Sequence, residues 1–294
     1  MKKEMIEVKQ IDWFDDHFYK IRYINEAKVE IEDYFPSTTT KLGAIAKPFL
    51  IGWYGDLGTR EATLRRDEAA ETGTRLHWAW YNYCEGNGIV YQQPQKPVYT
   101  EEEMTELRAK FPQIVVLTKQ EEMYNMTKLE QFVKVVKPTF LFNEVIVYDI
   151  EHREAGQVDN IIDIEEGKYK VNGLTPLSLP KGRYIFDLKS GKSVGKEAKM
   201  QLADYAIMAE KGGYGPIEGA LIAHTQSKNK NGIEGFGLIY LDKKAIQEEY
   251  SDFRDIAKVW DRNFGNRKPV IRQIPGLISL NQKEVADETT TKGK

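Results

Sequence analysis

Polar and apolar residues alternate in two short runs near the N-terminus. Between residues 17 and 34, aromatic and aliphatic side chains alternate with charged ones on either side of Asn25-Glu26-Ala27. A period of two is typical of a β-strand with one buried face, and an Asn-containing segment between two such runs favours a turn. The pattern predicts a β-hairpin within residues 1–36.

Residues 37–138 show mainly the spacing of amphipathic helices. Ser37 and Thr59 are candidate N-caps, Pro48 is typical of a first helical turn, and Gly73 is expected to interrupt a helix that ends near Glu71. The other elements expected here are helices over 76–83, 101–111 and 120–136 and a strand over 114–117. We interpret residues 37–138 as a helical extension.

From residue 139 onward, strand-type runs dominate. Strands are expected over 140–150, 156–164, 183–189, 220–225 and 236–241, and helices over 196–211 and 243–264. Strands interleaved with helices favour an α/β fold in which helices flank a central sheet. We therefore expect one domain over residues 1–280, with its core over 139–280, and a polar, disordered tail over 281–294.

Length and composition fit this interpretation. A chain of 294 residues with 41% hydrophobic and 30% charged residues is typical of a globular protein. No apolar run reaches 18 residues, and the N-terminus lacks the apolar region of a signal peptide. The single cysteine, Cys84, cannot form an internal disulfide, which agrees with a reducing compartment. We expect a cytoplasmic protein that does not enter membranes.

Charge is distributed unevenly along the chain. The net charge of −3 argues mildly against general nucleic-acid binding. Residues 181–199, however, contain six basic residues against two acidic ones, a local charge of +4. Such a segment could contact phosphates near a scissile bond. The alternative is an ordinary solvated loop and helix start.

Two aspartates, Asp159 and Asp187, lie in strand-type runs, where aspartate is rare because its short polar side chain packs poorly. Asp187 and Lys189 share one strand face, roughly 6.6 Å apart along the strand, while Phe186 and Leu188 lie on the other. We expect the second face to be buried and the first to be presented. This layout is typical of a metal-dependent phosphodiesterase; the alternative is an Asp–Lys ion pair on an exposed strand.

Four short sequence motifs follow one another along the chain. They are Gly73-Thr74-Arg75-Leu76-His77, Ala155-Gly156-Gln157-Val158-Asp159, Asp187-Leu188-Lys189-Ser190-Gly191 and Gln201-x-x-x-Tyr205. Together they resemble the RecB-like exonuclease branch of the PD-(D/E)XK nuclease superfamily, over residues 37–225. Relatives in that branch include phage exonucleases and the mitochondrial genome maintenance exonuclease. The resemblance implies a restriction-endonuclease-like core with a mixed sheet.

The resemblance also implies an activity and a metal site. The expected activity is divalent-metal-dependent hydrolysis of DNA from its ends, in recombination, repair or phage DNA processing. Asp159, Asp187, the backbone carbonyl of Leu188 and His77 would hold one or two Mg²⁺ or Mn²⁺ ions, because carboxylate and carbonyl oxygens suit Mg²⁺ and imidazole shifts the preference toward Mn²⁺. Lys189 would hydrogen-bond the attacking water. For His77, the alternative is an ordinary helix histidine among aromatics.

Three further residues match the branch. Glu144 corresponds to a glutamate that precedes the first core carboxylate; it either orients a water or satisfies nearby backbone groups. Gln201 and Tyr205 lie four residues apart on one helix face and would hold the phosphate or Lys189, although Tyr205 could equally serve packing. His17, His152 and His224 have no such context, and we interpret them as ordinary.

Candidate DNA contacts are Arg75, Lys192 and Lys196, with solvated surface as the alternative for the two lysines. Aromatic side chains could stack on unpaired bases, although most of the candidates are expected in the core. The candidates are Trp53, Tyr54, Trp78, Trp80, Tyr81 and Tyr83. With one cysteine, the chain cannot form the four-cysteine iron–sulfur cluster of some relatives.

Several alternatives remain open on the sequence alone. The same motifs would occur in an endonuclease of this fold and in a non-catalytic DNA-binding protein that retains the fold. A single-strand annealing or recombination partner and an oligomeric assembly are both compatible with the resemblance. Strand preference and digestion polarity are not encoded in any motif that we can interpret.

Overall fold

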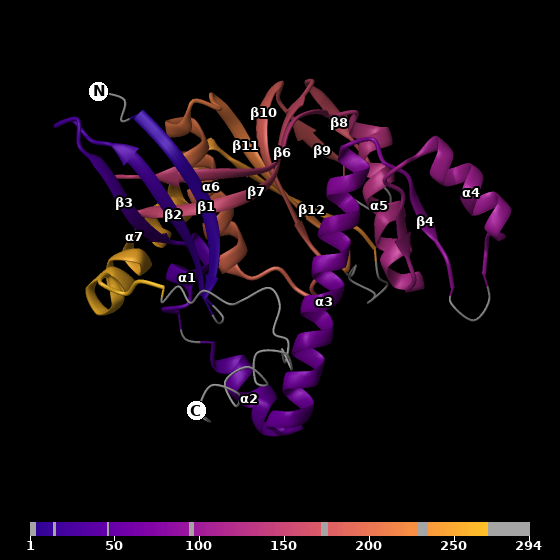
Figure 1. Cartoon of the computed structure of the whole chain (residues 1–294), viewed down its shortest axis with the longest axis horizontal. Helices are drawn as coiled ribbons and strands as arrows, with labels where there is room; N and C mark the ends of the chain where they lie inside the picture. The colour runs from indigo at the N-terminus through magenta and orange to yellow at the C-terminus, as the bar shows by residue number, and fades with distance from the viewer. Residues whose placement is uncertain are drawn as a thin grey trace, which may run out of the picture.

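Five strands of the described chain form a mixed β-sheet at the centre of the molecule, and helices cover both of its faces (Figure 1). The computed structural model describes residues 4–13, 16–45, 47–93, 97–171, 176–227 and 235–269. The strand order is β12-β11-β10-β7-β6, with β10 and β11 parallel and every other neighbouring pair antiparallel. The strands are β6 (Thr139–Asp149), β7 (Glu154–Ile164), β10 (Gly182–Lys189), β11 (Ile217–His224) and β12 (Gly237–Asp242). The α/β class with a central mixed sheet is confirmed.

Two helices cover one face of the sheet. The parallel strands β10 and β11 are joined by helix α6 (Lys196–Gly212), as a parallel connection requires. Gly213 ends α6 at a φ of 90°, a conformation that glycine adopts without steric cost. Helix α7 (Lys243–Phe264) is capped by the Asp242 side chain and packs beside α6. Both helices begin and end close to their expected positions.

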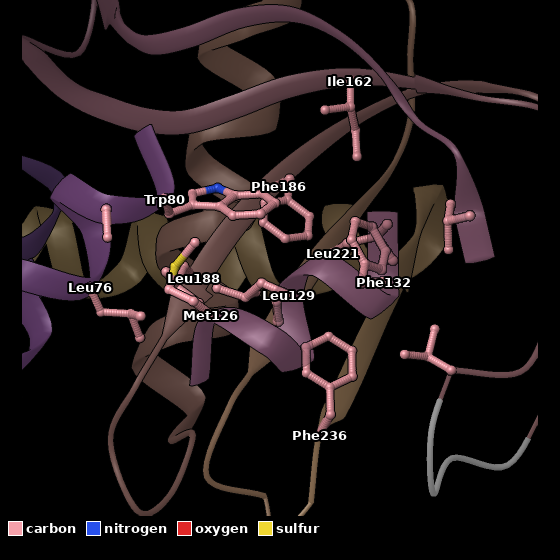
Figure 2. Close-up of a cluster of buried hydrophobic side chains, with 14 of the residues drawn as sticks. Leu76, Trp80, Met126, Leu129, Phe132, Ile162, Phe186, Leu188, Leu221 and Phe236 are labelled. Atoms are coloured by element: carbon pink, nitrogen blue, oxygen red, sulfur yellow. The ribbon is translucent and has the colours of Figure 1, made fainter. Parts of the chain in front are cut away.

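The opposite face packs against helices α3 (Thr59–Cys84) and α5 (Gln120–Val136). Figure 2 shows Trp80 of α3 and Phe132 of α5 on either side of Phe186 of β10. Helices from residues 37–138 therefore share one hydrophobic core with the sheet. The expectation that only one face of β10 is buried is wrong, because Ile185, on the other face, is fully buried under α6.

Helix α3 runs without a break through Gly73, and the expected interruption there is wrong. A glycine inside a helix costs about 0.5–1 kcal/mol relative to alanine. At Gly73 an added Cβ would lie 3.3 Å from Ser190 Oγ, at the end of β10. The glycine thus permits a close approach between α3 and β10. Thr59 is the first helical residue, and Gly58 occupies the N-cap position.

The N-terminal residues form a three-stranded sheet in the described chain rather than a hairpin alone. Strands β2 (Asp16–Ile24) and β3 (Glu30–Pro36) form the expected hairpin, and the Asn25 side chain accepts hydrogen bonds from the backbone in its turn. Strand β1 (Glu4–Trp13) pairs with β2 and was not expected. A register irregularity between Met5 and Glu7 disturbs the alternation that would have identified it.

Shorter elements complete the described chain. Helix α1 (Thr38–Leu42) is capped by Ser37 as expected, and α2 (Pro48–Leu57) begins at Pro48. Helix α4 (Glu101–Lys110) starts with a capping box, and the parallel pair β4 (Ile89–Tyr91) and β5 (Val115–Leu117) lies near it. Strands β8 (Gly167–Tyr169) and β9 (Leu177–Leu179) form a small ladder; they and β4 were not expected.

Two sequence expectations concern other properties of the chain. The tail over 281–294 lies outside the described residues. Among the described helices, none is long and apolar enough to cross a membrane.

A buried ionic network ties α1 to the core. Lys41 of α1 and Glu154 of β7 are both fully buried, and their charged atoms lie 3.2 Å apart. Arg254 of α7 contacts the same Glu154 oxygen at 2.6 Å, and Asp261 lies 3.2 Å from Lys41 Nζ. Charges removed from water need such partners, because a buried unpaired ion is costly. This network fixes α1 against β7 of the central sheet and against α7.

Candidate active site

Strands β7 and β10 separate at the point where the two aspartates lie. Their last ladder pair is Phe186 with Asn160, so continued pairing would place Asp187 opposite Asp159. The Leu188 N–H instead donates to Asp159 Oδ2 at 2.7 Å. The N–H and C=O of one strand residue point to the same side, so the Leu188 carbonyl faces the Asp159 side of the strand. Two carboxylates and a backbone carbonyl are thereby brought to one place.

His77 reaches this place from α3. Its Nδ1 lies 3.2 Å from Asp159 Oδ1, and about a third of its side chain is exposed. Burial lowers the pKa of His77, but the neighbouring Asp159 carboxylate outweighs this and raises it above the ordinary value. Burial raises the pKa of Asp159, but His77 and Lys189 outweigh this and lower it. Both shifts favour the charged forms of the two side chains.

Asp187 is held by its neighbour on the same strand face. Its Oδ2 lies 2.8 Å from Lys189 Nζ, and its side chain is 6% exposed. That contact lacks hydrogen-bond geometry, so this buried oxygen has no hydrogen-bond partner in the described chain. Burial raises the pKa of Asp187, and Asp159 adds to this although Lys189 opposes it. A buried carboxylate oxygen without a hydrogen bond can accept a cation or a proton donor.

Helix α6 contributes the side chains that hold Lys189. Lys189 Nζ donates to Gln201 Oε1 at 3.2 Å, and Gln201 Nε2 donates to the Tyr205 hydroxyl at 2.9 Å. The ammonium needs an acceptor, which fixes the orientation of the amide. Burial raises the pKa of Tyr205 well above its ordinary value, so the phenol stays protonated.

Gly156 of β7 makes room for Tyr205. An alanine Cβ at this position would lie 2.1 Å from Tyr205 Cε1. Gly156, in the motif that ends in Asp159, is thus required by the packing of Tyr205, which belongs to another motif.

For the DNA hydrolysis that the resemblance implies, we expect Gly156→Ala to lower the rate by about tenfold to a hundredfold. A displaced Tyr205 would shift Gln201 and Lys189, and misplacement by about 1 Å can cost a hundredfold. Initial rates on linear DNA measure this. Gly55→Ala in α2 is the matched control, since an added Cβ there has no neighbour within 4 Å. Equal rates for Gly156→Ala and wild type would show that Tyr205 plays no part.

Glu144 of β6 lies beside Asp159 and has an unusual backbone. Its φ is 48°, a left-handed value that costs a non-glycine residue about 1–3 kcal/mol. The flanking pairs, Asn143 with Asn160 and Val145 with Val158, place it next to Asp159 across the ladder. Burial and the Asp159 charge raise its pKa. The ladder position and the effect of Asp159 on its pKa both place Glu144 beside Asp159.

Part of this site lines a groove of about 920 Å³. The lining side chains from the site are His77, Glu144, Asp159, Gln201 and Tyr205, whereas Asp187 and Lys189 lie behind the lining. One wall is the face of α3 that carries Thr74, His77, Trp78 and Tyr81, and the other comes from the N-terminal sheet and α1. The floor is formed by β7 and α6. The residues contributed by the N-terminal sheet and α1 are Gln10, His17, Tyr19, Ser37 and Thr39. His17, which we interpreted as ordinary, thus lies on a wall of the groove that contains Asp159.

The candidate DNA contacts Arg75 and Lys196 are engaged elsewhere in this structure. Arg75 Nε donates to buried Glu122 at 2.6 Å, which fixes α3 against α5. Lys196 pairs with Asp252 at 2.6 Å, whereas Lys192 is exposed. Elsewhere in the basic segment 181–199, Lys181 and Arg183 pair with acids from β7 and the turn that follows it. Most of the local positive charge is therefore offset by partners that are distant in sequence.

A second group of possible metal ligands lies at the turn between β6 and β7. Asp149, His152 and Glu154 place one ligand atom each within 4.8 Å of one another, and the group could hold a metal ion. The described residues His77, Asp159 and Asp187 do not meet this distance criterion. Lys211 contacts Asp149, and Lys41 and Arg254 contact Glu154, so a cation at the turn would compete with three basic side chains. Sequence reasoning missed this group, although its short spacing across a turn is visible.

The Asp149 contacts predict a pH-dependent contribution to stability. Burial raises the pKa of Asp149, but hydrogen bonds from Lys211 and His152 outweigh this and lower it from 3.8 to about 2. A carboxylate whose pKa is lower in the folded than in the unfolded protein stabilises the fold when the pH is above 3.8. This stabilisation is lost as the pH falls toward 2. Asp149→Asn should therefore have a lower unfolding free energy than wild type at pH 5. The difference between the two proteins should be about 1 kcal/mol smaller at pH 3 than at pH 5. Urea unfolding at both pH values measures this, and a deficit independent of pH would contradict it.

Comparison with known proteins assigns no family to the chain. No family model matches it, and no curated protein matches it in sequence.

Proposed function

We propose that the protein is a divalent-metal-dependent deoxyribonuclease that acts from DNA ends, with the site organisation of PD-(D/E)XK nucleases. One observation carries the proposal. Residues from four separate sequence motifs lie next to one another around Asp159 and Asp187, and the resemblance implies a role for each of them. They are His77, Asp159, Asp187, Lys189, Gln201 and Tyr205.

The donor set fits a divalent metal ion. Asp159 and Asp187 offer hard carboxylate oxygens, and the Leu188 carbonyl lies on the side of its strand that faces Asp159. His77 adds a ring nitrogen 3.2 Å from Asp159 Oδ1. The Asp187 oxygen without a hydrogen bond is the group that such an ion would satisfy. When bound, Mg²⁺ or Mn²⁺ would neutralise phosphate charge and make a water more acidic.

The surrounding side chains have separable tasks in this proposal. Lys189 is charged, because the carboxylates Asp187 and Asp159 raise its pKa despite the opposing effect of burial. It would donate a hydrogen bond to the attacking water and offset negative charge on the phosphate. Gln201 and Tyr205 hold its ammonium group in position. Glu144, with its raised pKa, is placed to accept a hydrogen bond from water beside Asp159.

The experiment compares linear and covalently closed circular DNA with Mg²⁺ or Mn²⁺. We expect linear DNA to be degraded progressively and closed circles to stay intact. Cleavage of closed circles would establish the endonuclease alternative. If linear DNA stays intact in both metals while the protein still binds it, the non-catalytic alternative holds and the proposal fails.

A further inference from the structure

One face of α3 carries the residues that line the groove. Ala70, Thr74, His77, Trp78 and Tyr81 recur at helical spacing and all contact the groove. Trp78 is 51% exposed, whereas its neighbour Trp80 on the buried face is 1% exposed. A half-exposed tryptophan in a polar groove does not serve the core. Trp78 is therefore one of the candidate aromatics that does not belong to the core.

Apart from the carboxylates of Glu144 and Asp159 and the imidazole of His17, most of the remaining lining consists of neutral polar groups. Amides come from Gln10, Asn82, Gln113, Gln157 and Gln201, and hydroxyls come from Ser37, Thr39, Thr74 and three tyrosines. No lysine or arginine occurs among the described residues that line it. A binding surface that followed a nucleic-acid backbone would need several cations for the phosphates. Amides and hydroxyls instead suit the hydrogen-bonding edges of bases.

We propose that this groove binds unpaired DNA through its bases, with the Trp78 indole as the stacking platform beside the scissile phosphate. The inference rests on the proposed function for the position of that phosphate. A base in a duplex has both faces covered by neighbouring pairs, so only an unpaired base can offer a free ring to Trp78. The substrate strand is therefore single-stranded where it passes between α3 and the N-terminal sheet.

The test measures binding separately from cleavage. Fluorescence anisotropy follows a labelled oligo(dT) of twelve nucleotides with Ca²⁺ in place of Mg²⁺, and a gel confirms that the probe stays intact. Competitors are an abasic oligonucleotide of the same length and a duplex. We expect the abasic strand and the duplex to compete at least about tenfold more weakly than oligo(dT), and Trp78→Ala to weaken oligo(dT) binding by about tenfold.

Two variants serve as controls. Phe264→Ala removes an aromatic of similar exposure at the end of α7, away from the groove, and should leave binding unchanged. Trp78→Phe keeps a stacking ring and should restore most of the affinity. The inference is overturned if the abasic strand competes as well as oligo(dT), if Trp78→Ala binds like wild type, or if oligo(dT) does not bind. If binding depends on the bases but no hydrolysis occurs in Mg²⁺ or Mn²⁺, the nuclease proposal fails and the binding inference stands.

Discussion

Replacing Asp187 with alanine is expected to reduce metal-dependent DNA hydrolysis by about a thousandfold, which is the upper range for loss of one electrostatic partner in an active site. The substitution removes a buried carboxylate from the site beside Asp159 and leaves Lys189 without its partner at 2.8 Å. Substrate affinity should change far less than the turnover rate, because Trp78 and the amides of the groove remain. Initial rates at saturating linear DNA give the comparison.

The matched control is Asp163→Ala. Asp163 lies on β7 four residues beyond Asp159, and its half-exposed side chain pairs with Arg183 outside the groove. Removal of this exposed ion pair should cost under about 1 kcal/mol of stability and leave the rate unchanged. Hydrolysis by Asp187→Ala at the wild-type rate would exclude Asp187 from the chemistry.

Replacing Lys41 with methionine is expected to lower the free energy of unfolding by up to about 3 kcal/mol, the lower end for breaking a buried ion pair, because Glu154 stays buried and keeps Arg254 as a charged partner at 2.6 Å. Glu154 stays fully buried, and its Oε1 already has no hydrogen-bond partner in the described chain. Methionine retains most of the volume, so the loss reports the charge rather than a cavity. Urea unfolding near neutral pH measures the difference.

Lys244→Met provides the comparison for this substitution. Lys244 is on α7, its side chain is 84% exposed, and it lies 3.6 Å from Glu248 one turn away. Its replacement should change stability by less than about 0.5 kcal/mol. Equal effects of the two substitutions would show that the Lys41–Glu154 pair does not hold α1 to the core.

Local patterns predicted most of the secondary structure because the period and the end signals agreed. The strand expected over 183–189 is β10, and the helices expected over 196–211 and 243–264 are α6 and α7. At α6 the glycines at its C-terminal end fix the boundary, and at α7 the Asp242 cap fixes the start. Such signals act within one or two turns, so a single sequence is sufficient to identify them.

The errors arose where a distant partner decides the conformation. Gly73 was expected to break a helix, but it lies under Ser190 and the helix continues. Ile185 was expected on an exposed face, but α6 covers it. Arg75 is held by Glu122, 47 residues further along the chain. None of these contacts has a local sequence signal, because each depends on the packing of whole elements.

The candidate site likewise contains residues that the sequence indicated and features that it did not. The resemblance named the residues that lie around Asp159 and Asp187, and their proximity in the fold agrees with those roles without testing them. It did not indicate the groove wall from the N-terminal sheet, the exposure of Trp78 or the group at Asp149, His152 and Glu154. These features depend on loops and on an added sheet, and no motif describes them.

Calorimetric titration with Mn²⁺ tests the central claim most directly, because the proposal places the ion at Asp159 and Asp187, whereas the group that meets the ligand-distance criterion in the described chain is Asp149, His152 and Glu154. The variants are Asp187→Asn, at the proposed site, and His152→Ala, at the turn between β6 and β7. The nuclease account predicts that Asp187→Asn weakens Mn²⁺ binding by about tenfold or more, whereas His152→Ala binds like wild type. Mn²⁺ binding that is lost in His152→Ala and unchanged in Asp187→Asn would contradict the account.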